Sequence, residues 1–139
     1  MTMATQTPPV LLTLEWLGDL RFAGRSGTTE MVLDSRAEAG PTPVQAVAYG
    51  LAGCMAIDVV SILQKGRHPL TGVRASLVGH RASTVPARFT AFDLHLDVAG
   101  NLPGDAVERA IALSREKYCS VWHSLRQDIT LSVTWTVCA

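Results

Sequence analysis

Three cysteines carry the most obvious chemistry in this sequence, and each stands in a different setting. Cys54 lies within the apolar stretch YGLAGCMAIDVV, with small residues one helical turn before it and Asp58 one turn after it. Cys119 stands where one predicted helix ends and the next begins, a place where the helix dipole lowers the pKa of a thiol. His123, one turn further on, adds to that effect if it is protonated. Cys138 falls on the polar face of the last predicted strand, where no neighbour could activate it.

Neither Cys54 nor Cys119 establishes a reaction by itself. Free cysteine is commonly buried and packs as a small hydrophobic residue, and buried cysteines are usually inert. A histidine beside a helix end is most often a solvated side chain. Three cysteines are an odd number, and here they are widely spaced without a CxxC pair. This pattern argues against a disulfide framework and predicts the reducing cytoplasm.

The composition argues against some classes of function. The 139 residues are 47% hydrophobic and include twelve acidic and twelve basic residues, which give a formal net charge of zero. Zero net charge and the lack of a basic cluster argue against binding to nucleic acid or to an anionic membrane. The length predicts one domain over residues 1–139. Residues 1–9 do not resemble a secretory signal and are predicted to be a flexible tail.

Residues 44–63 form a segment that is long and apolar enough to cross a bilayer. Asp58 lies inside it, and an aspartate at the centre of a membrane costs about 2.5–3.5 kcal/mol. A helix that is apolar on every side is also typical of a buried central helix, so we expect no membrane association. One sheet cannot cover such a helix on all sides. A second copy of the chain is the simplest source of the missing cover, which predicts a homodimer with these helices near the interface.

The remaining pattern predicts strands and helices in blocks. Thr42, Pro43 and Gln45 form a helix start, because threonine caps, proline suits the first helical position and glutamine can close a capping box. Gly66 suits the end of that helix, and Asp105 suits the N-cap of a later one. The predicted strands are 10–17, 20–25, 29–34, 71–81, 89–98 and 129–138, and the predicted helices are 43–64, 105–118 and 121–126.

These elements follow the order βββ-α-ββ-α(α)-β. Short turns between neighbouring strands favour antiparallel hairpins, so the predicted class is α+β, with antiparallel sheets around a long buried central helix. We find no internal repeat, no low-complexity tract and no second domain in the sequence.

Three segments carry a resemblance to known proteins: GPTPVQAVAYGLAGCMAIDVVSILQKGR, PARFTAFDLHLDVAG and VERAIALSREKYCSV. In their order and spacing they resemble the OsmC/Ohr family of small thiol-dependent peroxidases. The resemblance spans most of the chain from Gly40 to Val121, and the two cysteine-bearing helices are its most specific part. It implies an OsmC-like fold and an intertwined homodimer with two active sites at the interface.

The resemblance also implies a chemistry for two of the cysteines. Cys54 would attack the distal oxygen of an organic hydroperoxide as a thiolate, release an alcohol and become a sulfenic acid. Cys119 would then condense with it to form an intrasubunit disulfide, which a cellular dithiol reduces. No metal or organic cofactor would be needed. The residues expected to line the substrate pocket are Gln45, Leu51, Asp58 and Tyr118.

The match is weaker at the groups that should ionise the thiol. In the family an arginine from the N-terminal region does this, held by a glutamate at the start of the long helix. Arg21 lies in about the right predicted strand, with Arg25 and Arg36 as rivals. Val44 stands ten residues before Cys54, where the resemblance leads us to expect the carboxylate.

Three other functions fit parts of the pattern. The missing glutamate favours a non-catalytic or weakly active OsmC-like protein that binds a small molecule in the same cavity. A zinc site would have suitable ligand types but no short-range ligand pair such as CxxC or HxxxH; its candidate ligands are Cys54, Asp58, Cys119 and His123. A Cys–His hydrolase lacks a recognisable oxyanion hole and a third orienting residue. The favoured function is the peroxidase.

Overall fold

The computed structural model of the chain describes residues 7–139, so most of the predicted tail lies outside the described residues. The chain divides into two compact units, one that ends at Ala46 and one that spans Val47–Ala139. Helix α1 (Pro43–Lys65) begins in the first unit and continues into the second. Strands and helices occur in separate blocks, which confirms the predicted α+β class.

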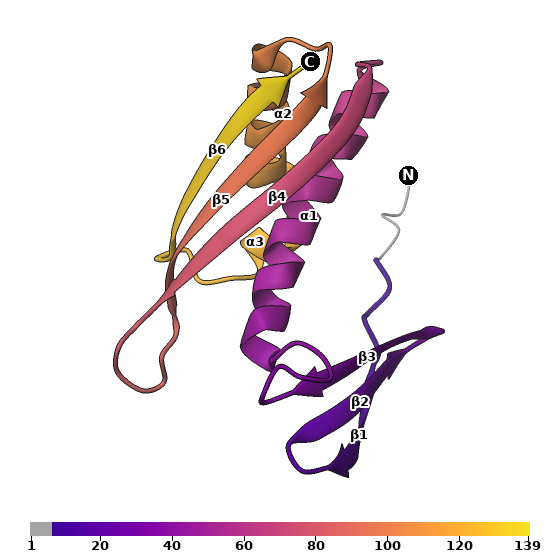
Figure 1. Cartoon of the computed structure of the whole chain (residues 1–139), viewed down its shortest axis with the longest axis vertical. Coiled ribbons are helices and arrows are strands. Elements are labelled where there is room, and N and C mark those ends of the chain that lie inside the picture. Colours follow the sequence, from indigo (N-terminus) through magenta and orange to yellow (C-terminus); the bar gives the residue numbers. More distant parts are fainter. Residues whose placement is uncertain (1–6) are drawn as a thin grey trace, which may run out of the picture. The chain divides into compact units, whose positions relative to one another are not determined.

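The first unit contains a three-stranded antiparallel sheet in the order β1-β2-β3 (Figure 1). Its strands are β1 (Thr13–Gly18), β2 (Arg21–Ser26) and β3 (Thr29–Asp34). Two residues separate β2 from β3, and Gly27 there takes a φ of 58°. Glycine adopts this left-handed conformation without steric cost, so the SG dipeptide of the sequence marks the turn.

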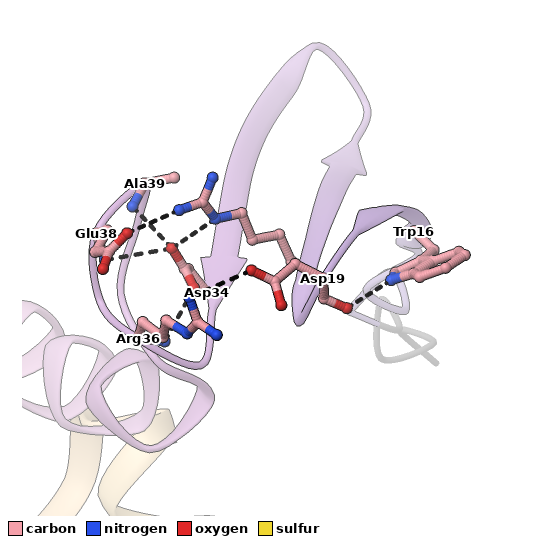
Figure 2. A network of polar contacts seen from close by, with 7 residues as sticks. Trp16, Asp19, Asp34, Arg36, Glu38 and Ala39 are labelled. Carbon is pink, nitrogen blue, oxygen red and sulfur yellow. Dashed lines mark hydrogen bonds and ion pairs between the residues drawn. The ribbon is translucent and has the colours of Figure 1, made fainter.

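The loop after β3 is organised by one buried carboxylate. Asp34 accepts hydrogen bonds from the backbone N–H groups of Arg36 at 2.9 Å and Ala39 at 3.0 Å (Figure 2). Its Oδ2 atom also accepts a bond from Nε of Arg21 at 3.0 Å. The bonds from the Ala39 and Arg36 amides, with help from the Arg21 guanidinium, lower the pKa of Asp34 to about 2.

Helix α1 begins with the predicted capping box. The N–H of Gln45 donates to Oγ1 of Thr42 at 3.0 Å, and the N–H of Thr42 donates to Oε1 of Gln45 at 3.0 Å. The end of the helix differs from the prediction, because Arg67 rather than Gly66 takes the left-handed conformation, with a φ of 60°. The N–H of His68 closes that end by donating to the carbonyl of Leu63 at 3.1 Å.

The second unit contains a sheet in the order β4-β5-β6, formed by β4 (Leu70–Arg81), β5 (Phe89–Gly100) and β6 (Thr130–Cys138). Strands β4 and β5 are antiparallel, but β5 and β6 are parallel, so the prediction of purely antiparallel sheets is wrong for this pair. The reason is the connection between them, which holds α2 (Gly104–Leu113), the π-helical turn η1 (Ser114–Tyr118) and α3 (Ser120–His123). A helical crossover of this kind returns the chain to the end of the sheet where the previous strand began.

The helices cover one face of this sheet (Figure 1). Strand β5 alternates buried apolar residues with exposed acidic ones, as its period of two predicts. Helix α1 supplies a stripe with a spacing of four residues, and α2 begins after Pro103 rather than after the predicted cap Asp105. The core residues from these three elements are Phe92, Leu94, Leu96 and Val98 of β5, Leu51, Met55, Val59 and Leu63 of α1, and Val107, Ala110 and Ile111 of α2.

The rest of α1 is not buried within one chain, which agrees with the expectation that one sheet cannot cover this helix on all sides. Ile57 is 70% exposed and Tyr49 is 71% exposed, while the stripe that contains Met55 is completely buried. The helix is long and apolar enough to span a membrane by length and composition. Because core helices of soluble proteins pass the same test, this single segment is only a weak indication of a membrane span. The exposed side of α1 therefore carries large apolar side chains at the surface of the chain.

We predict that the contribution of Asp34 to stability depends on pH in a specific direction. Its pKa is lowered to about 2 in the folded chain, against about 3.9 for an unperturbed aspartate, so the contribution is complete above about pH 5 and is lost as the pH falls through about 2. Asp34→Asn should therefore lower the free energy of unfolding by a constant amount above about pH 5, and the gap to wild type should close towards pH 2. Urea unfolding over this pH range measures the gap. A gap that stays the same at every pH would contradict the assignment.

Candidate functional site

Two thiols and a carboxylate meet within the second unit. The Sγ atoms of Cys54 and Cys119 and a carboxylate oxygen of Asp58 all lie within 4.8 Å of one another. Cys54 and Asp58 stand one turn apart on α1, and Cys119 directly precedes α3. Both thiols are free. The structure therefore brings together the two cysteines that the sequence analysis selected, with Asp58 beside them.

Small residues on α1 allow this approach. Gly50 lies one turn before Cys54, and a Cβ atom placed on Gly50 would lie 3.9 Å from the methyl carbons of Val121 on α3. A side chain larger than alanine at position 50 would reach the same methyl groups and push the two helices apart. The short distance between Cys54 and the segment that carries Cys119 thus depends on the small residue at position 50.

Cys119 is positioned by an irregular turn. In η1 the N–H of Cys119 donates to the carbonyl of Ser114 at 2.8 Å, a bond that spans five residues instead of four. Turns of this π-helical type are rare and are frequent at functional sites. Cys119 then takes an extended conformation and caps α3, where its Sγ atom accepts a hydrogen bond from the N–H of Trp122 at 3.4 Å. The predicted placement of Cys119 between two helices is confirmed.

The predicted effect of that placement on the Cys119 thiol is wrong. Cys119 is completely buried, and this burial raises its pKa to about 11, with Cys54 and Asp58 adding to the increase. The hydrogen bond from the N–H of Trp122 acts in the opposite direction but is outweighed. Helix α3 has only four residues, so its dipole is short, and the loss of hydration dominates. The Cys119 thiol therefore stays protonated at neutral pH.

The carboxylate of Asp58 is held by a residue that the sequence analysis missed. Oγ of Ser114 donates to Oδ2 of Asp58 at 2.8 Å, and Ser114 is completely buried. A signal for this contact exists in the sequence, because Ser114 continues the helical spacing of Val107 and Ile111 on the buried face of α2. A hydroxyl on such a face needs a hydrogen-bond partner, and the only acidic residue in the apolar α1 segment supplies it.

A hollow of about 370 Å³ opens beside Asp58. Two of the four predicted pocket residues, Asp58 and the half-exposed Tyr118, line it. The other two have different surroundings: Leu51 is completely buried in the core, and Gln45 uses its side chain in the capping box of α1. The lining residues are Asp58, Ser61, Ile62, Lys65, Leu113 and Tyr118.

Arg21 is held by two carboxylates of the first unit. Its Nε atom lies 3.0 Å from Oδ2 of Asp34, and its Nη2 atom lies 2.9 Å from Oε2 of Glu38. Asp34 and Glu38 were missed in the sequence analysis, which looked for the carboxylate at the start of the long helix and found Val44 there. Asp34 ends β3 directly opposite Arg21 of β2, and Glu38 lies in the loop that follows β3.

The two rival arginines are less constrained. Arg25 pairs with Glu30 on the neighbouring strand, and both side chains are about two thirds exposed, at 67% and 65%. Nη1 of Arg36 lies 3.5 Å from Asp19, again with both side chains largely exposed (Figure 2). Exposed ion pairs of this kind hold a side chain only weakly.

His123 and Cys138 lie outside the cluster of thiols and carboxylate. Nε2 of His123 donates to the carbonyl of Arg115 at 3.0 Å, and His123 is exposed. The four-ligand zinc site considered from the sequence is therefore wrong in this residue. Cys138 is exposed near the end of β6, and its thiol lies 3.7 Å from the carbonyl of Val98.

Comparison with known proteins places the chain in a family. The OsmC-like protein family matches residues 35–134, so the chain belongs to the OsmC-like family. Protein YhfA of Escherichia coli K12 is 37% identical over 129 residues, which cover 91% of this chain and 96% of that protein. A hypothetical protein from Aquifex aeolicus VF5 has a similar structure, with a TM-score of 0.88 and 25% identity over 95% of this chain and 98% of that one.

A structure described as an organic hydroperoxide resistance protein OsmC, from Legionella pneumophila, shares the fold. Its TM-score is 0.71, with 17% identity over 96% of this chain and all of the other, 100%. The family predicted from the three sequence segments is thus confirmed, and the fold is that of OsmC and organic hydroperoxide resistance proteins.

We predict a wide difference in alkylation rate between the cysteines of the native, reduced protein. With a pKa of about 11, Cys119 has roughly one thiolate per thousand thiols at pH 8, and it is also buried, whereas Cys138 is exposed. Iodoacetamide should therefore modify Cys138 much faster than Cys119, and the Cys119 rate should rise about tenfold per pH unit up to about pH 11. Peptide mass spectrometry after timed quenching measures both rates. Equal rates in the native protein would show that Cys119 is neither buried nor protonated; in urea the difference should disappear.

Proposed function

We propose that this protein is a thiol-dependent peroxidase that reduces organic hydroperoxides to alcohols. The observation that carries the proposal is the pair of free thiols, from two separate segments, whose sulfur atoms lie within 4.8 Å of each other. Membership of the OsmC-like family supports it, as does the fold shared with a structure described as an organic hydroperoxide resistance protein.

The difference in burial between the two thiols supports a separate role for each in this proposal. Cys54 is partly exposed, so a peroxide can reach it, whereas Cys119 is completely buried. Burial also raises the pKa of Cys119 to about 11, which makes it a poor first nucleophile at neutral pH. Cys54 is therefore the peroxidatic cysteine, and Cys119 is the resolving one.

The reaction runs in three balanced steps. The Cys54 thiolate attacks the distal oxygen of the hydroperoxide, the O–O bond breaks, and the leaving alkoxide takes a proton to become the alcohol. The Cys119 thiol then attacks the sulfur of the Cys54 sulfenic acid, which forms the disulfide and releases water. A dithiol returns two electrons and two protons, as expected for a protein of the reducing cytoplasm. Since a disulfide bond is about 2.05 Å long, the two sulfur atoms must still approach by side-chain rotation.

Arg21 is the arginine best suited to promote ionisation of the Cys54 thiol in the assembled protein. Two carboxylates hold it, and its side chain is only 35% exposed, about half the exposure of its rivals. We propose that Asp34 and Glu38 do the positioning that a glutamate at the start of the long helix does in the family. A fixed guanidinium stabilises a thiolate better than a mobile one, because it loses less conformational entropy on approach.

We predict that cumene hydroperoxide converts the reduced protein to a form that is about 2 Da lighter, through a bond between Cys54 and Cys119. Cys54→Ser should abolish this loss and the consumption of peroxide. Cys119→Ser should keep the first turnover and accumulate a sulfenic acid that dimedone traps. Intact-mass spectrometry and peptide mapping measure each product.

The matched control is Cys138→Ser, which removes a thiol outside the cluster and should react like wild type. If wild type and Cys54→Ser remain equally inert towards the peroxide, the peroxidase assignment is wrong, and a binding protein with the same fold becomes the better description.

We also propose that the protein is a homodimer that covers the exposed side of α1. A groove of about 470 Å³ runs between α1 and β4 on this side, lined chiefly by Ala56, Ile57 and Val60 of the helix and Val73 and Ala75 of the strand. Its walls are apolar, and contiguous apolar surface of this kind marks a protein interface. A second copy would bring an identical apolar helix to the same groove.

We predict that Ile57→Glu converts this dimer to a monomer, because the substitution places a charge in the centre of the apolar surface. Size-exclusion chromatography with light scattering should give twice the chain mass for wild type and for the control Ile57→Leu, and the chain mass for Ile57→Glu. A wild-type protein that is monomeric at micromolar concentration would overturn the dimer.

A further inference from the structure

We propose that the reduced forms of Cys54, Asp58 and Cys119 together bind a thiophilic divalent metal ion, Zn²⁺ above all. The proposal concerns a second state of the site, separate from its reaction with peroxides. Its regulatory consequence, described below, rests on the proposed peroxidase function, whereas the binding itself does not.

The geometry suits a zinc ion. Bonds of about 2.3 Å to sulfur and 2.0–2.2 Å to oxygen place the ligands of a tetrahedral Zn²⁺ about 3.5–3.8 Å from one another. The three donor atoms already lie within 4.8 Å of one another, so rotation of the side chains by one ångström or less per atom, as an order of magnitude, closes the site. Cys54 and Asp58 form a ligand pair on adjacent turns of α1, at the same i, i+4 spacing as HxxxH. The sequence analysis named both residues as candidate zinc ligands but did not recognise them as a short-range pair.

The donor types select the class of metal. Two thiolates and one carboxylate favour Zn²⁺ and related thiophilic ions over Mg²⁺ or Ca²⁺, which prefer oxygen ligands. Three protein ligands leave a fourth position for water or another small ligand, and one of the three, Asp58, also lines a hollow of about 370 Å³. His123 is not a ligand, because its Nε2 atom is bound to the carbonyl of Arg115 at 3.0 Å.

The surroundings of the three ligands support metal binding. Oγ of Ser114 donates to Oδ2 of Asp58, which orients the carboxylate in the way that outer-shell partners orient metal ligands. The N–H of Trp122 points at Sγ of Cys119 at 3.4 Å and stabilises a thiolate there. Both contacts are already formed in the structure, so two of the three ligands are oriented in advance.

Metal binding is coupled to protons and to oxidation. Each bound Zn²⁺ displaces the protons of two thiols, so affinity should rise with pH. The burial that keeps Cys119 protonated opposes binding, but the charge of the ion offsets the cost of burying a thiolate. A sulfur atom coordinated to zinc shares the lone pair that would attack a peroxide, and a disulfide cannot bind the ion. The metal would therefore block the peroxidase cycle, and oxidation of the site would release the metal.

Cobalt(II) tests the site directly, since thiolate ligands give a charge-transfer absorption band that oxygen and nitrogen ligands do not. We expect the reduced, metal-free protein to bind one equivalent of Co²⁺ under anaerobic conditions with such a band, and Zn²⁺ to displace it. Cys54→Ser and Cys119→Ser should lose most of the band. Ser114→Ala should keep the band but weaken the affinity about 10-fold or more. Cys138→Ser and His123→Ala are the matched controls and should bind as wild type does.

Absence of the band in wild type, or a band unchanged in Cys54→Ser, would overturn the metal site. A band that depends on His123 would overturn the ligand set. The peroxidase is tested separately by cumene hydroperoxide on the metal-free protein. If that protein consumes peroxide and one equivalent of Zn²⁺ does not slow it at least tenfold, the regulatory consequence is wrong. If it consumes none but still binds Co²⁺ through both thiols, the peroxidase fails and the metal site stands.

Discussion

The close packing of α1 against the segment α2–η1–α3 is the constraint on which the chemistry of this protein depends. A small residue at position 50 allows the contact with Val121, and the buried stripe of α1 fixes the rotation of that helix against β5. With the rotation fixed, Cys54 and Asp58 can only face the turn that carries Cys119. Core packing thus places the two sulfur atoms close together, and no loop has to close to bring them there.

The two thiols differ because they differ in access to water. Cys119 is completely buried and its thiol stays protonated at neutral pH, whereas Cys54 is partly exposed. The same difference decides how the site would respond to a metal ion, which must displace the proton that burial retains. Asp58 and its partner Ser114 add a fixed negative charge that a neutral alkyl peroxide does not need but that a cation would use.

Most of the secondary structure and the two cysteines of the candidate site could be predicted from the sequence. The period of β5, the capping box at Thr42 and Gln45, and the break before α3 follow from local rules, and the structure confirms them. The parallel pairing of β6 was missed although the helices before it were predicted, because the sequence pattern of a strand does not say which strand lies beside it. Long-range polar contacts were missed for the same reason. The bond between Ser114 and Asp58 joins residues 56 positions apart, and Asp34 holds Arg21 from the neighbouring strand β3.

The direction of the pKa change at Cys119 could not be predicted from the sequence either. A residue before a helix suggests a stabilised thiolate, but the result depends on how long that helix is and on how much water reaches the sulfur. Here α3 has one turn and the sulfur has no contact with solvent, so local motif and tertiary burial act in opposite directions. The carboxylates that hold Arg21 were also missed. The family pattern indicates a carboxylate at the start of the long helix, whereas Asp34 and Glu38 lie before that helix.

In the π-helical turn η1, the direction of the Cys119 side chain depends more on the number of residues between Ser114 and Cys119 than on which residues they are. Each residue of an α-helix advances the side-chain direction by about 100°. Loss of a single amino acid from this turn would restore a regular helix and swing the thiol at its end through about that angle, away from its counterpart on α1. Homologues that differ here by one deletion would keep both cysteines in an alignment and yet have no dithiol in space.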